Sequence, residues 1–173
     1  MAGVKRSIEM LVLGLIAEKP SHAYLLKRSI DRLIGGFHRV SDGMLYPLLR
    51  ELEERRYISG REEKGDHAPD KVVYTLTKEG EERIGELLAS PLRSLHYGDS
   101  MDFFARFALF GHLSSSERVK VLRERLKVCD SALQKLAAAA EGIPSDGYAF
   151  ELIRRSVEIV EGECEWLMGL ISK

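Results

Sequence analysis

The sequence has few of the residues that mark a disulfide framework, and no apolar run long enough for a membrane span. Only two cysteines occur in 173 residues, and Cys129 and Cys164 lie inside helical patterns without paired spacing. We therefore expect buried, reduced thiols and a protein of the reducing cytoplasm. No apolar run approaches the ~18 residues of a membrane helix, and no cleavage-like pattern follows the first apolar run. Neither export nor a membrane partner is expected.

Patterns typical of metal, phosphate and catalytic sites are also missing. The five histidines lack the paired spacing of metal ligands. Gly35 and Gly36 follow a helical pattern and no strand, so they indicate a helix end and not a phosphate-binding loop. No Ser/His/Asp, Cys/His or paired-carboxylate arrangement stands at a recognisable spacing. The sequence predicts no metal, no cofactor and no enzyme activity.

The chain as a whole has almost no net charge. Lys and Arg number 26 and Asp and Glu number 27, so no overall positive charge indicates nucleic acid. The first third differs, because up to Arg50 eight Lys and Arg stand against four Asp and Glu, a local net charge of +4. Basic residues are thus concentrated in the N-terminal part.

Three short helices are predicted before any strand. The first carries apolar residues from Ile8 to Leu15 and ends before Pro20. Ser21 is expected to cap the second, which ends at the glycine pair. The inner stripe of the second helix is predicted to be Ala23, Leu26, Ile30 and Leu33.

The third helix covers Ser41 to Arg56, with the Ser41 side chain as its expected cap. Leucines at 45, 48, 49 and 52 recur at i, i+3, i+4 and i+7 and predict one buried face. The opposite face shows Gly43, Tyr46 and Pro47 before its first arginine, Arg50. Such a face suits close approach to another surface.

A β-hairpin and a fourth helix follow. Tyr57 and Ile58 open one strand, V-V-Y-T-L forms the other, and Thr77 is expected to cap the next helix, which Pro91 closes. Three helices, a hairpin and a helix make a winged helix-turn-helix, whose third helix enters a major groove of DNA.

Three runs carry a family resemblance: P-S-H-A-Y-L-L-K-R-S-I, S-D-G-M-L-Y-P-L-L-R-E-L-E-E-R-R-Y-I and A-P-D-K-V-V-Y-T-L-T-K-E-G. With them the chain resembles the PadR family of prokaryotic transcriptional regulators, from Ile8 to about Leu88. The resemblance implies a winged helix that binds palindromic operators in double-stranded DNA as a homodimer, with an appended helical region that makes the dimer.

The resemblance also implies roles for residues. It places Ser41, Gly43, Tyr46 and Arg50 on the DNA side of the recognition helix. The complete candidate DNA-binding set is Tyr24, Lys27, Arg28, Arg39, Ser41, Gly43, Tyr46, Arg50, Lys64 and Lys71. Two alternatives stay open: Tyr24 could be a half-buried domain tyrosine, and Arg50 could pair with Glu53 or Glu54 on its own helix.

The predicted wing departs from the family pattern. Ala68 stands where many members have Arg, and Val72 stands where a second basic residue often follows the Lys. Acidic residues surround the few cations of this loop. We therefore expect few phosphate contacts from the wing and a shallow salt dependence of binding.

The C-terminal part is predicted to be helical, with two seams of apolar residues at alternating steps of three and four. The predicted organisation is a DNA-binding domain at 1–88, a linker at 89–98 and a helical dimerisation domain at 99–173. The candidate dimerisation residues are Leu122, Leu126, Leu133, Leu136, Ile153, Val160, Leu167 and Ile171. Five further apolar residues lie off the seams, and a second copy is expected to cover them: Val121, Val128, Ile159, Trp166 and Leu170.

The predicted fold class is therefore mainly α with a small β-hairpin. The preferred hypothesis is a sequence-specific transcriptional regulator, a repressor that binds an inverted repeat as a homodimer and is released by a small-molecule effector. The alternative is a winged-helix module that binds protein partners and not DNA, which the acidic wing and the absence of net positive charge favour.

Overall fold

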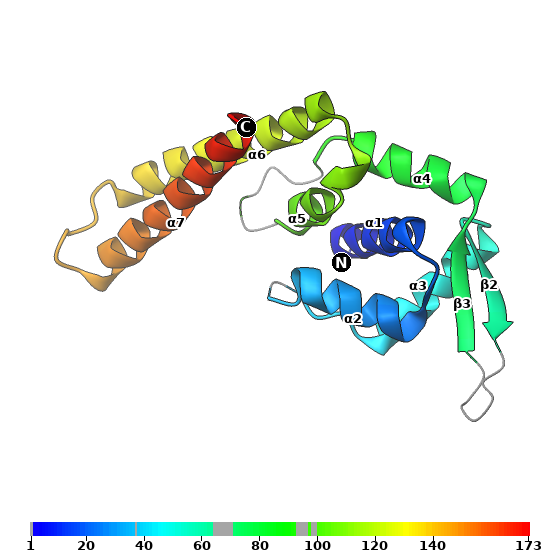
Figure 1. Cartoon of the computed structure of the whole chain (residues 1–173). Helices are drawn as coiled ribbons and strands as arrows, with labels where there is room; N and C mark the ends of the chain where they lie inside the picture. Colours follow the sequence, from blue (N-terminus) through cyan, green and yellow to red (C-terminus); the bar gives the residue numbers. More distant parts are fainter. Residues whose placement is uncertain (1, 37, 64–70, 93–96, 98–99) are drawn as a thin grey trace. The chain divides into compact units, whose positions relative to one another are not determined.

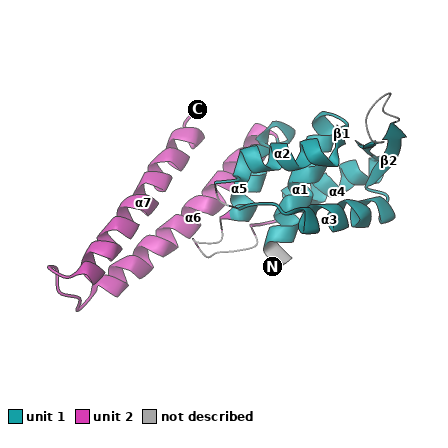
Figure 2. Cartoon of the chain, turned by 90° about the horizontal axis from the view of Figure 1, so that it is seen from below, with its two compact units in different colours: residues 1–90, 101–113 teal, residues 91–100, 114–173 magenta. Residues whose placement is uncertain are grey.

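The computed structural model describes residues 2–36, 38–63, 71–92, 97 and 100–173. The chain divides into two compact units (Figure 2). Unit 1 consists of residues 1–90 together with Met101–Leu113, and unit 2 consists of Pro91–Ser100 together with Ser114–Lys173. The fold is mainly helical with one small antiparallel sheet, as predicted.

Unit 1 is built around helix α1 (Ala2–Glu18), which contacts α2 (Ala23–Ile34), α4 (Lys78–Ala89) and α5 (Met101–Ala108) (Figure 1). A further helix, α3 (Asp42–Glu54), follows α2 and packs on it. The apolar side chains of α1 face these neighbours and are almost fully buried: Ile8, Met10, Leu11, Val12, Leu13 and Ile16.

The sheet of unit 1 has three strands in the order β1-β3-β2. The hairpin of β2 (Ile58–Glu63) and β3 (Lys71–Leu76) is the predicted wing, and β1 (Ser21–His22) adds to the other edge of β3. Tyr74 on the central strand pairs with Ser21 on one side and with Gly60 on the other. The arrangement of helices and hairpin is a winged helix-turn-helix.

Two predicted helix caps were wrong in detail. Ser21 lies in β1, where its hydroxyl donates to the carbonyl of Lys19 at 3.0 Å, and the cap position of α2 falls on His22. Ser41 occupies the cap position of α3, but its side chain makes no capping hydrogen bond. The cap at Thr77 is confirmed, since its Oγ1 accepts from Gly80 N at 3.1 Å.

The inner stripe of α2 also differs from the prediction at one position. Leu33 is 45 % exposed, whereas Ile34 is buried together with Leu26 and Ile30. The steps of four between these three isoleucine and leucine residues keep them on one face of the helix, and Leu33 falls beside it.

The predicted boundary between the domains does not match the packing of α5. Residues 99–173 were expected to form one helical domain, but Met101–Leu113 packs with unit 1. The contact with α1 is close: a Cβ on Gly14 would lie 2.4 Å from Cδ2 of Leu109. Glycine at position 14 therefore lets the segment after α5 approach α1.

Unit 2 contains the predicted helical hairpin, formed by α6 (Ser115–Ala140) and α7 (Tyr148–Ile171). A capping box starts α6: Glu117 Oε2 accepts from Ser114 N at 2.8 Å, and the Ser114 hydroxyl accepts from Glu117 N at 3.4 Å. Cys129 and Cys164 are free and buried, as expected. Burial, with Glu163 nearby, raises the pKa of the Cys129 thiol to about 12.

The candidate dimerisation residues of the two seams are not equally accessible. Three of them are buried (Leu122, Val160 and Leu167), and the other five are partly buried (Leu126, Leu133, Leu136, Ile153 and Ile171). Among the residues off the seams, Val121 and Val128 are buried, against the prediction that a second copy covers them. Ile159 and Trp166 are exposed, as that prediction requires.

Among the helices that the structure describes, none is both long and apolar enough to cross a membrane.

Candidate nucleic-acid interface

Helix α3 turns an uncovered face away from the core of unit 1. Its four leucines, at 45, 48, 49 and 52, are buried as predicted, because they lie on one side of the helix. On the other side Gly43, Tyr46, Pro47 and Arg50 are exposed, and Tyr46 is 45 % exposed. The helix is continuous through Pro47. The structure thus presents a small residue, an aromatic ring and a guanidinium on one surface.

Two contacts fix the start of α3. Lys27 on α2 forms an ion pair with Asp42, with 2.7 Å between Nζ and Oδ1. Asp31, also on α2, accepts a hydrogen bond from the backbone N–H of Val40 at 3.3 Å. Helix α2 therefore sets where α3 begins. Lys27, one of the candidate DNA-binding residues, thereby neutralises the one carboxylate in the first turn of α3.

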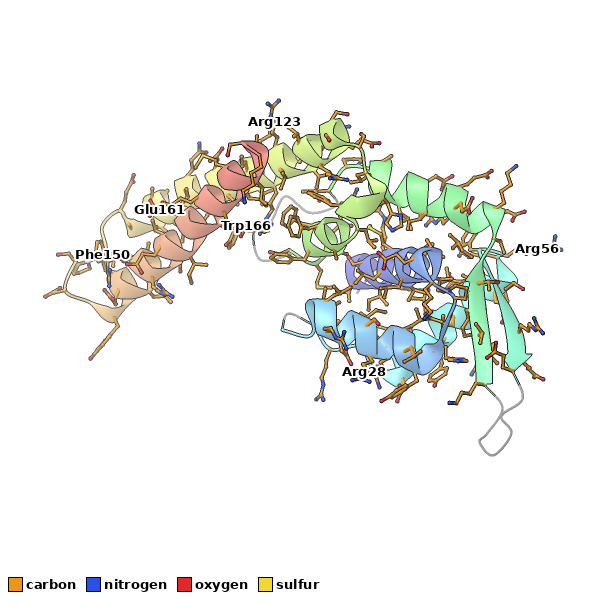
Figure 3. The ribbon with its side chains drawn as sticks, in the orientation of Figure 1. Arg28, Arg56, Arg123, Phe150, Glu161 and Trp166 are labelled. Carbon is orange, nitrogen blue, oxygen red and sulfur yellow. The ribbon has the colours of Figure 1, made fainter. Side chains whose placement is uncertain are left out.

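The remaining predicted residues are accessible where the structure describes them. Tyr24 is 68 % exposed, so the alternative of a half-buried tyrosine does not hold. Arg28 lies on the outer side of α2 (Figure 3), and Arg39, Ser41 and Lys71 are exposed as well. Lys64 lies outside the described residues.

Arg50 forms no ion pair within the described part of the chain. The alternative of an Arg50 pair with Glu53 or Glu54 is therefore not what the structure shows. The neighbouring Glu51 is engaged instead, because it pairs with Lys5 and Arg55. The hydrogen bond from Lys5 holds the pKa of Glu51 below its usual value.

The connection between α3 and the wing was missed by the sequence reasoning. Oε1 of Glu53 accepts a hydrogen bond from the backbone N–H of Gly60 in β2, at 2.9 Å. Tyr74 lies beside them and is 9 % exposed. Burial, followed by the nearby charge of Glu53, raises the pKa of Tyr74. The signal that could have indicated this contact is a glycine inside a β pattern, which often marks close approach of another group.

The part of the chain that forms the winged helix and the exposed face of α3 matches a known protein family. Residues 12–86 match the transcriptional regulator PadR-like family. This stretch of the chain is a PadR-like domain. It includes α2, α3, the wing and most of α4, so the whole candidate interface lies within it. The expectation that the chain is not an enzyme agrees with this family, whose members are transcriptional regulators.

Curated relatives match slightly less than half of the chain. The transcriptional regulator YqjI of Escherichia coli is 32 % identical over 79 residues, which cover 46 % of this chain and 36 % of that protein. The probable transcriptional regulator Rv1176c of Mycobacterium tuberculosis is 30 % identical over 81 residues, covering 47 % of this chain and 43 % of that protein. The matched part thus spans less than half the length of these relatives.

Solved structures include PadR-like regulators. One from Bacillus cereus is 26 % identical and covers 50 % of this chain and 82 % of its own, with a TM-score of 0.43. Bacillus subtilis PadR in complex with operator DNA is 17 % identical and covers 95 % of this chain and 97 % of its own, with a TM-score of 0.45.

Proposed function

We propose that this protein is a sequence-specific DNA-binding transcriptional regulator, and that α3 of the PadR-like domain is its recognition helix. The observation that carries the proposal is the uncovered face of α3, on which Tyr46 and Arg50 are exposed and Arg50 has no ion pair among the described residues. An exposed guanidinium beside small residues suits close approach to base edges, where arginine binds guanine through two hydrogen bonds.

Other exposed groups of unit 1 support contact with the phosphate backbone. Arg28 and Tyr24 on α2, Arg39 before α3 and Lys71 on the wing offer cations and a hydroxyl to phosphate oxygens. The ion pair of Lys27 with Asp42 removes an uncompensated negative charge at the start of α3. A protein of this kind acts where the DNA is, in the cytoplasm.

The proposed regulator acts as a homodimer on an inverted repeat. An exposed apolar stripe on α7 supports this: Leu152, Ile159 and Trp166 recur every seven residues and are 68 %, 50 % and 40 % exposed. Trp166 lies on α7 in Figure 3. Covering such a stripe with the same stripe of a second copy gives a two-fold dimer. Two recognition helices could then occupy half-sites about 34 Å apart. The proposal includes repression by occupying the operator and release by a small-molecule effector.

The first test is fluorescence anisotropy on labelled DNA of random sequence, from which bound molecules are selected and sequenced. We expect the wild type to select an inverted repeat. Arg50→Ala is expected to bind that operator about 10- to 100-fold more weakly, because a base contact is lost. Arg123→Ala, which removes an exposed arginine from α6 in unit 2, is the matched control and should bind normally. Weak binding that is equal for all sequences and for all three proteins contradicts the proposal.

The dimer is tested separately by sedimentation equilibrium. Ile159→Glu places a charge in the apolar stripe, so it should shift the protein to monomer and weaken operator binding at low protein concentration. Met168→Glu is the matched control, since Met168 is also exposed on α7 at 53 %. It lies nine residues from Ile159, on the opposite side of the helix. Equal dissociation of the two variants would mean that the stripe is not the interface.

A protein-binding module is the second candidate function. Apolar side chains on α2 favour it, because Leu25 and Leu33 are each 45 % exposed. Loss of sequence selection in the anisotropy experiment would direct attention to this surface.

A further inference from the structure

Glu53 places a carboxylate on the face of α3 that is proposed to contact DNA, where a negative charge is unexpected. It is exposed and follows Tyr46 and Arg50 at steps of four and three residues, so the three side chains share one face of α3. A carboxylate on this face repels phosphate. At three residues from Arg50 it is also within reach of the guanidinium that the proposed base contact needs.

The structure holds this carboxylate elsewhere. Glu53 Oε1 accepts from the backbone N–H of Gly60 at 2.9 Å, which directs the side chain toward the base of the wing. The Glu53 carboxylate thus receives its hydrogen bond from the Gly60 amide and not from Arg50. The same hydrogen bond joins α3 to β2 directly.

Only glycine leaves room for this contact at position 60. A Cβ there would lie 2.6 Å from Oε1 of Glu53, 2.9 Å from Cγ1 of Val72 and 3.3 Å from Cε1 of Tyr74. The first two distances are shorter than a normal contact, so the side chains of Glu53 and Val72 would have to move to make room for a Cβ at position 60. Gly60 also pairs with Tyr74 in the register of the hairpin, so its backbone position is fixed by the sheet.

We propose that the hydrogen bond from Gly60 to Glu53 is a positioning contact of the recognition surface. It withdraws the Glu53 carboxylate from Arg50, so that the guanidinium stays available to a DNA base or phosphate, and it ties the wing to the recognition helix. Glu53 and Gly60 are positioning residues, which act through Arg50. This inference rests on the proposed DNA-binding function.

The test compares operator affinity in a set of variants. Gly60→Ala is expected to weaken operator binding about tenfold, because the added methyl displaces the carboxylate toward Arg50. Replacing Glu53 in the same protein, as Gly60→Ala with Glu53→Gln, should restore most of the lost affinity, since the competing charge is then gone. Gly60→Ala added to Arg50→Ala should cause little further loss. Gly85→Ala is the matched control, because a Cβ on Gly85 in α4 meets no atom within 4 Å.

A second variant covers the case in which Gly60→Ala fails to fold. Glu53→Asp keeps the charge on a side chain too short to reach the Gly60 amide, so it should weaken operator binding and show the same dependence on Arg50. Normal binding by Gly60→Ala, or failure of Glu53→Gln to rescue it, overturns the proposal. Lost selectivity at a single base pair in Glu53→Gln alone overturns it as well, because Glu53 would then read a base itself.

A measurement without DNA separates this inference from the proposed function. The backbone N–H of Gly60, followed by nuclear magnetic resonance, should keep its chemical shift and its rate of exchange with solvent in Arg50→Ala, because its acceptor Glu53 does not depend on Arg50. In Glu53→Asp the same N–H should exchange faster with solvent, because the shorter carboxylate no longer accepts its hydrogen bond. Absence of this difference overturns the positioning contact even if the protein binds DNA. Its presence in a protein that selects no operator supports the positioning contact and rejects only the DNA-binding role.

Discussion

Replacing Arg106 with methionine is expected to lower the free energy of unfolding of unit 1 by about 3–5 kcal/mol, the range found when one partner of a buried ion pair is removed. Arg106 on α5 is fully buried. Its Nε donates to Oδ2 of Asp102 at 3.1 Å, and its Nη1 donates to the carbonyls of Leu88 at 2.7 Å and Ser90 at 2.5 Å. The substitution leaves a buried carboxylate without this partner and two carbonyls at the end of α4 without this donor.

A second guanidinium completes the same cluster. Arg6 on α1 lies 3.6 Å from Oδ1 of Asp102 and also donates to Oγ of Ser90. The network therefore joins α1, the end of α4 and α5. Because all three segments depend on it, its loss should affect the whole of unit 1 and not α5 alone.

Urea denaturation followed by two probes measures this prediction. Trp166, the single tryptophan, lies in unit 2, so its fluorescence reports on that unit, whereas far-ultraviolet circular dichroism reports on both. Arg106→Met should move the part of the circular dichroism transition that belongs to unit 1 to lower urea. Arg32→Met, at an exposed arginine of α2, is the control. If both variants unfold at the same urea concentration, the network contributes little to stability.

Arg125→Met should destabilise unit 2 by about 2–4 kcal/mol, because Arg125 is also buried and holds several acceptors. Its Nε donates to Glu163 Oε1 at 2.7 Å, and its Nη2 donates to Ser100 Oγ at 2.8 Å. The guanidinium also lies over the ring of Tyr97, 4.8 Å from its centroid. Burial, and then the hydrogen bond with Glu163, raises the pKa of the Tyr97 hydroxyl.

Trp166 fluorescence measures this second effect. Arg125→Met should lower the urea midpoint, and Arg123→Met, at an exposed position of the same helix, should leave it unchanged. The raised pKa of Tyr97 makes the stability of unit 2 depend on pH. The contribution of the neutral Tyr97 hydroxyl to the free energy of unfolding is complete below pH ~10, the ordinary pKa of tyrosine. It is lost as the pH rises further, because Tyr97 ionises more readily in the unfolded chain than in the folded one. An unshifted midpoint in Arg125→Met would contradict the role of this cluster.

The two buried arginines change the interpretation of the segment predicted as a linker. Residues 89–98 were predicted to be a short linker between the two domains. Ser90 is bound by Arg106 and Arg6, and the Tyr97 carbonyl accepts from Arg125 at 3.4 Å. Both ends of the connection are therefore held, one within each unit.

Local periodicity was enough to predict most of the secondary structure. The leucines of α3, the β-rich run before Thr77 and the seams of α6 and α7 report burial through spacing alone, because a regular helix or strand repeats its inner face. The family resemblance added the candidate DNA-binding set, which the structure finds exposed at Tyr24, Tyr46 and Arg50.

Spacing could not predict contacts between residues far apart in the chain. Arg106 and Arg125 look like ordinary helix-surface cations in the sequence, and only their distant partners allow them to be buried. The same holds for Glu53, whose sequence neighbour Arg50 suggested a helix pair until the fold placed the Gly60 amide beside it. The sequence by itself determined the helices, the wing and the exposed face of α3. Only the tertiary structure decided that α5 packs with the winged helix. It also decided that Arg106 and Arg125 are buried and that the Glu53 carboxylate is held away from Arg50. These outcomes depend on the packing of segments that are distant in the sequence.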